Sequence, residues 1–222
     1  MKMKKPKASF VISRYKEDPS WIKNYTDDYI IYNKGEPLDD NFNAVKRPNI
    51  GGNQYDIAYF IHENYNNLPD LMAFVQGDPF DHCKKEKFDQ IIYNEEFTSL
   101  ESYEHLENTF AHIIDTDGGY TEINNSWFIL PHNQTHNLTC KYVSYHHFMR
   151  ETFEDYDYPN YIRFCPGSQY LVTKQQALQH PKNFWKYIMD QLPENNMTEA
   201  HIVERAFLYI LTGRYQVKDF LR

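Results

Sequence analysis

A short apolar run that ends in a glycine, an acid and a proline is the feature that most restricts the fold. Residues 71–75 are all apolar, and Gln76, Gly77, Asp78 and Pro79 follow them. Five successive apolar residues are typical of a strand buried on both faces, and the proline stops that strand. Because open α/β sheets bind ligands beyond the carboxyl ends of their strands, Asp78 is a candidate binding residue. The alternative is that Gly-Asp-Pro is an ordinary turn.

Strand-like and helix-like segments alternate in the first part of the chain. The predicted strands are residues 8–14, 28–32 and 71–76. A short helix is expected from Pro19 and a longer one after Asn53, and the residues between them at 36–48 are expected to form a loop. The longer helix has the apolar spacing of a helix docked on a sheet, at Ile57, Phe60, Ile61 and Tyr65. This alternation predicts a largely parallel sheet whose strand ends share one edge.

The remainder of the chain adds strands and helices to this unit. Further strands are predicted at 127–130 and 169–172, and helices at 84–93 and 142–150, from Thr173, from Pro181 and from Thr198. Thr173 and Gln176 form a capping-box pair, and Gly213 is expected to end the last helix. The acidic residues 151–160 are predicted to form a mobile loop. We expect one α/β domain over residues 1–222, with a mostly parallel sheet of about six strands flanked by helices.

Composition excludes several classes of protein. The net charge of −8 disfavours a general nucleic-acid binder, which needs a basic surface. Cys83, Cys140 and Cys165 form no Cys-x-x-Cys pair, so neither a disulfide framework nor a zinc site is predicted. No apolar run approaches the roughly 18 residues of a membrane helix, and the first residues lack the pattern of a signal peptide. We therefore expect no membrane span and a cytoplasmic location.

Polar side chains follow each of the three early strands. They are Ser13, Arg14 and Tyr15, then Asn33, Lys34 and Gly35, then Gln76, Gly77 and Asp78. The turn with Asn49, Gly51 and Gly52 opens a helix, whose free N–H groups suit a phosphate, although two glycines before a helix are also a common turn. A cation, a helix start and a carboxylate at one edge fit a nucleotide diphosphate with Mn²⁺ or Mg²⁺, with Asp78 as the metal ligand.

Other motifs compete with this site. Asp115 and Asp117 form a literal Asp-x-Asp that can share a cation, although Asp-Gly is also a common turn. The histidine pairs, His132 with His136 and His146 with His147, have no metalloprotease frame and are expected to have ordinary packing or surface roles. No Gly-x-Ser-x-Gly is present, so a hydrolase nucleophile elbow is not supported.

Several segments together resemble one family. They are Ser13-Arg14-Tyr15-x-Glu17-x-x-x-Trp21, Tyr32-Asn33-Lys34-Gly35, Pro48-Asn49-x-Gly51, Leu68-Pro69-Asp70, Phe74-x-Gln76-Gly77-x-Pro79-Phe80-Asp81-His82, Phe164-x-Pro166-Gly167-Ser168-Gln169-Tyr170-x-Val172 and Val203-Glu204-Arg205-Ala206-Phe207. The chain resembles a domain-of-unknown-function family of fungi, bacteria and large DNA viruses. That family is related to glycosyltransferases of the GT-A fold, including chlorella-virus enzymes.

The resemblance implies a GT-A-like domain that transfers a sugar from a nucleotide-diphosphate sugar, with a UDP-sugar such as UDP-glucose favoured. The acceptor would be a hydroxyl of a glycan or glycoprotein, and for a viral chain the location would be the host cytoplasm. Asp78 would match the last acid of the GT-A Asp-x-Asp motif, whereas Gln76 replaces the first and adds no charge. The loop before Gln169 and the helix bearing Glu204 would line the sugar and acceptor side.

The resemblance leaves the mechanism open. Lys34 or Arg14, together with the metal, would stabilise the departing diphosphate. An inverting enzyme would need a base, for which Glu204 and Asp157 are candidates, whereas a retaining enzyme would not. Glu204 lies off the apolar face of its helix, which is also what a surface carboxylate does. The alternatives to a glycosyltransferase are a non-catalytic carbohydrate- or protein-binding module and a nucleotide-sugar hydrolase or nucleotidyltransferase.

Overall fold

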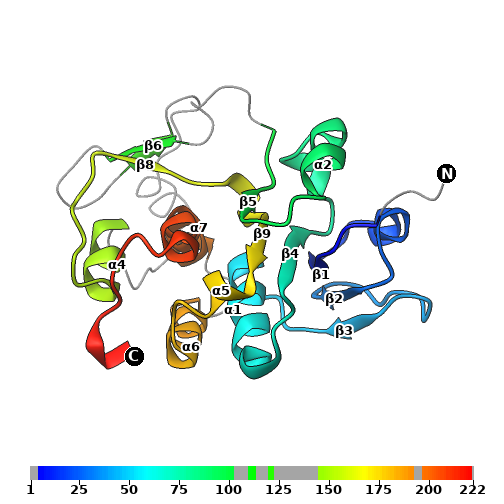
Figure 1. The fold of residues 1–222 in the computed structure, drawn as a ribbon, viewed down its shortest axis with the longest axis horizontal. Helices are drawn as coiled ribbons and strands as arrows, with labels where there is room; N and C mark the ends of the chain where they lie inside the picture. The colour runs from blue at the N-terminus through cyan, green and yellow to red at the C-terminus, as the bar shows by residue number, and fades with distance from the viewer. Residues whose placement is uncertain (1–4, 103–109, 114–119, 123–144, 193–196, 222) are drawn as a thin grey trace.

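The protein is built around a six-stranded central sheet (Figure 1). The computed structural model describes residues 5–102, 110–113, 120–122, 145–192 and 197–221. In spatial order the strands are β3 (Ala44–Lys46), β2 (Tyr29–Asn33), β1 (Ser9–Arg14), β4 (Leu71–Gln76), β9 (Tyr170–Thr173) and β5 (Thr98–Ser99). The first four are parallel, whereas β9 runs antiparallel to both β4 and β5. The predicted α/β class with a mostly parallel sheet is confirmed, and this arrangement is compatible with a GT-A-like fold.

The two faces of the sheet bury different apolar clusters, because successive strand residues point to opposite sides. One face contributes Val11, Met72 and Phe74 to a core shared with α1 (Gly52–Glu63), α6 (Lys182–Asp190) and α7 (Met197–Thr212). The other face contributes Phe10, Ile12 and Ala73 to a core shared with the 3₁₀ helix η1 (Pro19–Asn24) and with α2 (Lys85–Ile91). The run at 71–75 is therefore buried on both faces, as its composition predicts.

A second, short sheet lies apart from the central one, on the side of α4 and α7 (Figure 1). Its strands are β7 (Tyr120–Glu122), β6 (Phe110–Ile113) and β8 (Tyr161–Arg163), and both pairs are antiparallel. The backbone N–H of Arg163 donates to the hydroxyl oxygen of Tyr209 at 2.8 Å, which ties β8 to α7.

Several predicted elements are confirmed. Thr173 and Gln176 form the capping box of α5 (Lys174–Ala177), and Gly213, with φ of 64°, follows the end of α7. The predicted helix at 142–150 is α4 (Tyr145–Thr152) as far as the structure describes it. Within the described residues, no helix is long and apolar enough to cross a membrane. The predicted strand 127–130, Asp115, Asp117, His132, His136 and Cys140 lie outside the described residues.

Two predictions about connecting segments are wrong. The expected loop at 36–48 contains β3, which extends the sheet beside β2. The expected mobile loop at 151–160 is instead held by the C-terminal segment: the N–H of Glu154 donates to the carbonyl of Gln216, and the N–H of Gln216 donates to Asp155. Both errors concern pairings between segments, which a local polar pattern does not reveal.

Candidate functional site

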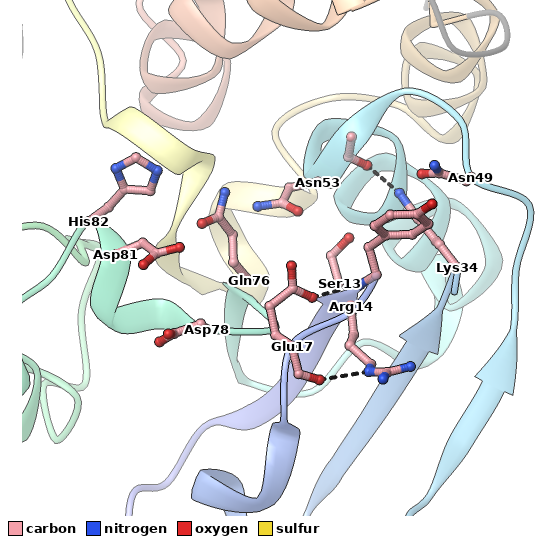
Figure 2. A pocket seen from close by; sticks show the side chains of 12 residues that line it. Ser13, Arg14, Glu17, Lys34, Asn49, Asn53, Gln76, Asp78, Asp81 and His82 are labelled. Atoms are coloured by element: carbon pink, nitrogen blue, oxygen red, sulfur yellow. Dashed lines mark hydrogen bonds between the residues drawn. The ribbon is translucent and has the colours of Figure 1, made fainter. Parts of the chain in front are cut away.

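A polar cavity of about 320 Å³ lies where the carboxyl ends of β1, β2 and β4 meet the first turn of α1 (Figure 2). It is lined by Ser13, Arg14, Tyr15, Glu17, Lys34, Asn49, Gly52, Asn53, Gln76, Asp78, Asp81 and His82. Eight of these are among the residues that the sequence predicts to bind a nucleotide sugar. The parallel strands explain the convergence, because their carboxyl ends share one edge of the sheet.

Three carboxylates form the acidic side of the cavity. Asp78 follows β4 and caps the 3₁₀ helix η3 (Pro79–Asp81), where its Oδ1 accepts from the N–H of Phe80 at 2.9 Å. Its Oδ2 has no hydrogen-bond donor among the described residues. Asp81 is exposed at the cavity, and Glu17 accepts through Oε2 from the N–H groups of Tyr15 and Lys16 at 2.8 and 3.0 Å. Asp78 thus has both a capping oxygen and an oxygen available to a ligand.

Gly77 is required by close packing beneath the cavity. The indole Nε1 of Trp21 donates to its carbonyl at 2.7 Å. A Cβ at this position would lie 2.6 Å from Oε2 of Glu17. Gly77 therefore brings the Glu17 loop against the end of β4, although it does not itself line the cavity.

Lys34 faces the cavity but is committed to the protein. Its Nζ lies 2.9 Å from Oδ2 of Asp56 and donates to the carbonyls of Ile50 and Gly52 at 3.2 and 2.6 Å. An ammonium group has three donors, and these three partners use them all. Lys34 therefore holds the turn before α1 in place and has no donor left for a phosphate.

Asp56 is the buried partner of Lys34, and sequence analysis did not single it out. It is buried on α1, and its Oδ2 also accepts from the hydroxyl of Ser13, whereas its Oδ1 is buried with no partner among the described residues. Burial raises the pKa of this carboxyl, and Lys34 and Ser13 oppose the rise. An acid among the buried positions of an otherwise apolar helix face is the one signal that could have revealed it.

Arg14 has a similar supporting role on the other side. Its Nε donates to the carbonyl of Glu17 at 2.8 Å, and its Nη1 donates to Oδ1 of Asn33 and to the carbonyl of Glu36, both at 2.7 Å. Asn33 is buried and also donates to Glu36 at 2.8 Å. This network joins the loops that follow β1 and β2, so Asn33 lies beneath the cavity rather than on its surface.

The first turn of α1 is shaped by two glycines. Gly51 and Gly52 have φ of 58° and 60°, and no side chain caps the helix. A Cβ on Gly51 would lie 2.7 Å from Cβ of Tyr55 and 2.8 Å from Cβ of Leu192. Gly52 and Asn53 line the cavity, so the start of α1, where a helix favours an anion, is exposed to it.

The segment before β9 supports the cavity from behind its lining residues. Asn53 donates from Nδ2 to the carbonyl of Gly167 at 2.8 Å. Gln169 is fully buried, accepts from the N–H of Gln76 and donates to the carbonyl of Pro79, both at 3.0 Å. Gln169 therefore joins this segment to the end of β4 and is not among the residues that line the cavity.

Neither predicted base lines the cavity. Glu204 accepts from the N–H of Gly167 at 2.8 Å and pairs with Arg205. Asp157 accepts from the hydroxyl of Tyr215 and pairs with Arg214 at 2.8 Å; the Tyr215 hydrogen bond and then Arg214 lower the pKa of this carboxyl. Both carboxylates are committed to the protein. Glu17 and Asp81 are instead cavity residues for which sequence analysis predicted no binding role.

The described residues contain no group of three or more His, Cys, Asp or Glu side chains arranged to hold a metal ion. Asp78 nevertheless fits a hard divalent cation, because it lines the cavity and one of its carboxylate oxygens has no donor among the described residues. A Mg²⁺-type ion commonly binds through one or two carboxylates and completes its shell with water and substrate phosphates. The donor set therefore suits a metal that arrives with a diphosphate better than a metal bound by protein alone.

These features define an α/β protein with a polar cavity at the carboxyl edge of its parallel strands. The chain belongs to the family described as "Protein of unknown function (DUF3431)", which matches residues 10–218. No curated protein and no solved structure matches the chain.

Proposed function

We propose that the protein is a metal-dependent glycosyltransferase that uses a nucleotide-diphosphate sugar, with a UDP-sugar favoured, and transfers the sugar to a hydroxyl of a glycan or glycoprotein. The observation that carries the proposal is the position of Asp78, at the end of β4 and on the same cavity as the start of α1. A carboxylate and a helix N-terminus together suit a cation and the phosphates that it accompanies. The motif resemblance supports the same proposal, and we propose a cytoplasmic location with it.

The charge around the cavity supports a metal requirement. Glu17, Asp78 and Asp81 are acidic, and the charge of Lys34 is balanced by Asp56. Arg14 is the remaining cation of the lining. A bare diphosphate would meet more negative than positive charge, and a divalent cation at Asp78 would remove that repulsion.

Different lining residues would bind different parts of a nucleotide sugar. The N–H groups at the start of α1 would bind the diphosphate, and the half-exposed ring of Tyr15 offers a surface on which a base can stack. The amides of Gln76 and Asn53 would bind sugar hydroxyls. When bound, the metal would neutralise charge on the departing diphosphate. An inverting reaction also needs a base, and Asp81 is a cavity carboxylate without a partner among the described residues.

Calorimetry with UDP- and GDP-sugars, with and without Mn²⁺, tests the proposal. We expect binding that Mn²⁺ strengthens by about tenfold or more, or about 1.4 kcal/mol. The variant Asp78→Asn should lose this gain but keep the cap of η3, because asparagine caps helices as well as aspartate does. Asp78→Ala should lose both the gain from Mn²⁺ and the helix cap. Thermal unfolding measures the loss of the cap separately from the loss of binding.

The control for the rival motif is Asp117→Ala, which should bind the nucleotide sugar as the wild type does. If Asp117→Ala abolishes the effect of Mn²⁺ and Asp78→Asn does not, the metal site belongs to the Asp115–Asp117 segment. Failure of every nucleotide sugar to bind the wild type would reject the proposed function.

The second candidate is a non-catalytic binding module on the same fold. One observation favours it: neither Glu204 nor Asp157 lines the cavity. The motif resemblance points the same way, because it would put Gln76 in the place of the first acid of the GT-A motif. Such a module would bind the nucleotide sugar with neither transfer nor hydrolysis during long incubation with acceptors. Cleavage of the pyrophosphate bond without sugar transfer would instead identify a hydrolase.

A further inference from the structure

The residues Cys165–Gln169, here called the strap, form an unusual piece of backbone beside the cavity. Gly167 and Ser168 have φ of 77° and 49°. Successive left-handed residues are uncommon, and a serine in that region needs support from its surroundings. Ser168 is fully buried. The strap is therefore held in this conformation by contacts with other elements.

Side chains from two helices supply those contacts. On α1, Asn53 donates to the carbonyl of Gly167 at 2.8 Å, and Gln54 donates from Nε2 to the hydroxyl of Ser168 at 3.0 Å. On α7, Oε1 of Glu204 accepts from the N–H of Gly167 at 2.8 Å. Both polar groups of the Gly167 backbone are thus bound by side chains, one from each helix.

Both oxygens of Glu204 are engaged. While Oε1 binds Gly167, Oε2 contacts Nη1 of Arg205, and the side chain is 13% exposed. The residue does not line the cavity. Glu204 is therefore arranged to hold the strap rather than to accept a proton from an acceptor hydroxyl.

The strap contacts two side chains of the cavity. A Cβ on Gly167 would lie 2.4 Å from Cδ2 of His82 and 3.2 Å from Nε2 of Gln76. Figure 2 shows the amide of Gln76 next to Asn53 and the ring of His82 farther to the left, above Asp81. Because the ring of His82 and the amide of Gln76 occupy the space that a side chain at position 167 would fill, we expect a shift of the strap toward them to displace one or both.

We propose that Glu204 is a positioning residue, which holds the strap and thereby sets the places of His82 and Gln76 on the sugar side of the cavity. The identity of the ligand rests on the proposed function, whereas the positioning role does not. The Glu204 carboxylate accepts the hydrogen bond of the Gly167 N–H and so fixes the strap, and the strap in turn limits where the side chains of His82 and Gln76 can lie.

The test compares Glu204→Gln with Glu204→Ala. The glutamine oxygen can still accept from Gly167 although the charge facing Arg205 is lost. Asp89→Ala is the control, because Asp89, like Glu204, uses both carboxylate oxygens, here for the Tyr25 hydroxyl and the Lys85 ammonium group, and does not line the cavity. The readouts are hydrogen exchange of the Gly167 amide, the NMR shifts of the His82 ring, and the dissociation constant for UDP-glucose with Mn²⁺.

We expect Glu204→Ala to expose the Gly167 amide, shift the His82 resonances and weaken binding about tenfold, as loss of a hydrogen bond to a charged group does. Glu204→Gln should retain binding within about threefold and retain turnover, and Asp89→Ala should change none of these readouts. Unchanged Gly167 exchange and His82 shifts in Glu204→Ala would overturn the proposal. So would a Glu204→Gln variant that binds normally but has lost turnover, because that result assigns Glu204 a chemical role.

The two proposals fail separately. If the wild type binds no nucleotide sugar, the proposed function is rejected, while Gly167 exchange and the His82 shifts still decide the role of Glu204. If Glu204→Ala does not fold, Glu204→Gln decides it: a protected Gly167 amide with unchanged His82 shifts supports the positioning role, and an exposed amide with unchanged His82 shifts overturns it.

Discussion

At the scale of the residue, the ion pair with buried Asp56 makes Lys34 a structural residue rather than the predicted phosphate ligand. The sequence predicts Lys34 as a phosphate ligand, but its ammonium group already has three partners in the protein. The side chains are 4% and 2% exposed, so neither charge is screened by water. A buried ion pair is costly to break because the remaining charge loses its nearest counter-charge.

Lys34→Met or Asp56→Asn alone should lower the free energy of unfolding by about 3 kcal/mol, measured by chemical denaturation. The matched control is the exposed pair of Lys186 and Asp190 on α6, where Asp190→Ala should cost less than about 1 kcal/mol. Equal effects at the two sites would contradict the assignment of Lys34 and Asp56 as a structural pair.

At the scale of the element, the start of α1 combines a structural and a binding constraint. Gly51 and Gly52 both have positive φ, but only Gly51 is enclosed by side-chain Cβ atoms, those of Tyr55 and Leu192. A Cβ on Gly52 would approach only the flexible side-chain end of Gln54 within 3 Å. Gly52 lines the cavity and Gly51 does not.

Gly51→Ala should therefore destabilise the protein more than Gly52→Ala. The left-handed backbone costs each alanine about 1–2 kcal/mol, and overpacking against Tyr55 and Leu192 adds about 1–3 kcal/mol at Gly51. Gly52→Ala should weaken nucleotide-sugar binding more than Gly51→Ala does, although it destabilises the fold less, because Gly52 lines the cavity. Thermal unfolding and calorimetry measure the two effects, and the reverse order of stabilities would contradict the packing argument.

At the scale of the whole molecule, one ion pair crosses between the two sheets. Glu101 follows β5 of the central sheet, and its Oε1 lies 3.6 Å from Nη2 of Arg163 on β8. Burial raises the pKa of Glu101 from 4.5 to about 7, and Arg163 only partly opposes this rise. Its Oε2 is buried without a partner among the described residues. The charged form is therefore poorly accommodated where the two sheets meet.

This pKa predicts a stability that falls as the pH rises. Between 4.5 and about 7 the folded state binds more protons than the unfolded state, so the free energy of unfolding decreases through that window. Glu101→Gln should remove this dependence and gain on the order of 2 kcal/mol relative to the wild type from about pH 5 to about pH 8. Glu96→Gln, at an exposed carboxylate, is the control. Parallel pH profiles for wild type and Glu101→Gln would contradict the assignment.

Much of the fold was predictable because it depends on local spacing. The run at 71–75, the apolar positions Ile57, Phe60 and Ile61 of α1 and the capping box of Thr173 and Gln176 each act over a few residues. The predicted helix was too long at its end, because Tyr65 lies in the separate 3₁₀ helix Tyr65–Asn67. The edge strand β3 and the antiparallel direction of β9 were not predictable, because both depend on which strands become neighbours. For the same reason the acidic segment 151–160 reads as a free loop although the C-terminal segment holds it.

The sequence by itself determined the α/β class and the edge of the sheet at which a site forms, since apolar runs followed by polar residues mark strands and their ends. Only the tertiary structure decided which polar groups remain for a ligand. Lys34 forms an ion pair with Asp56, and Glu204 accepts a hydrogen bond from Gly167, which lies 37 residues before it in the chain. Buried polar groups must find partners, and those partners are chosen by packing across the whole chain. Asp78 lines the cavity and remains available to a ligand, because the helix cap uses only one of its two carboxylate oxygens.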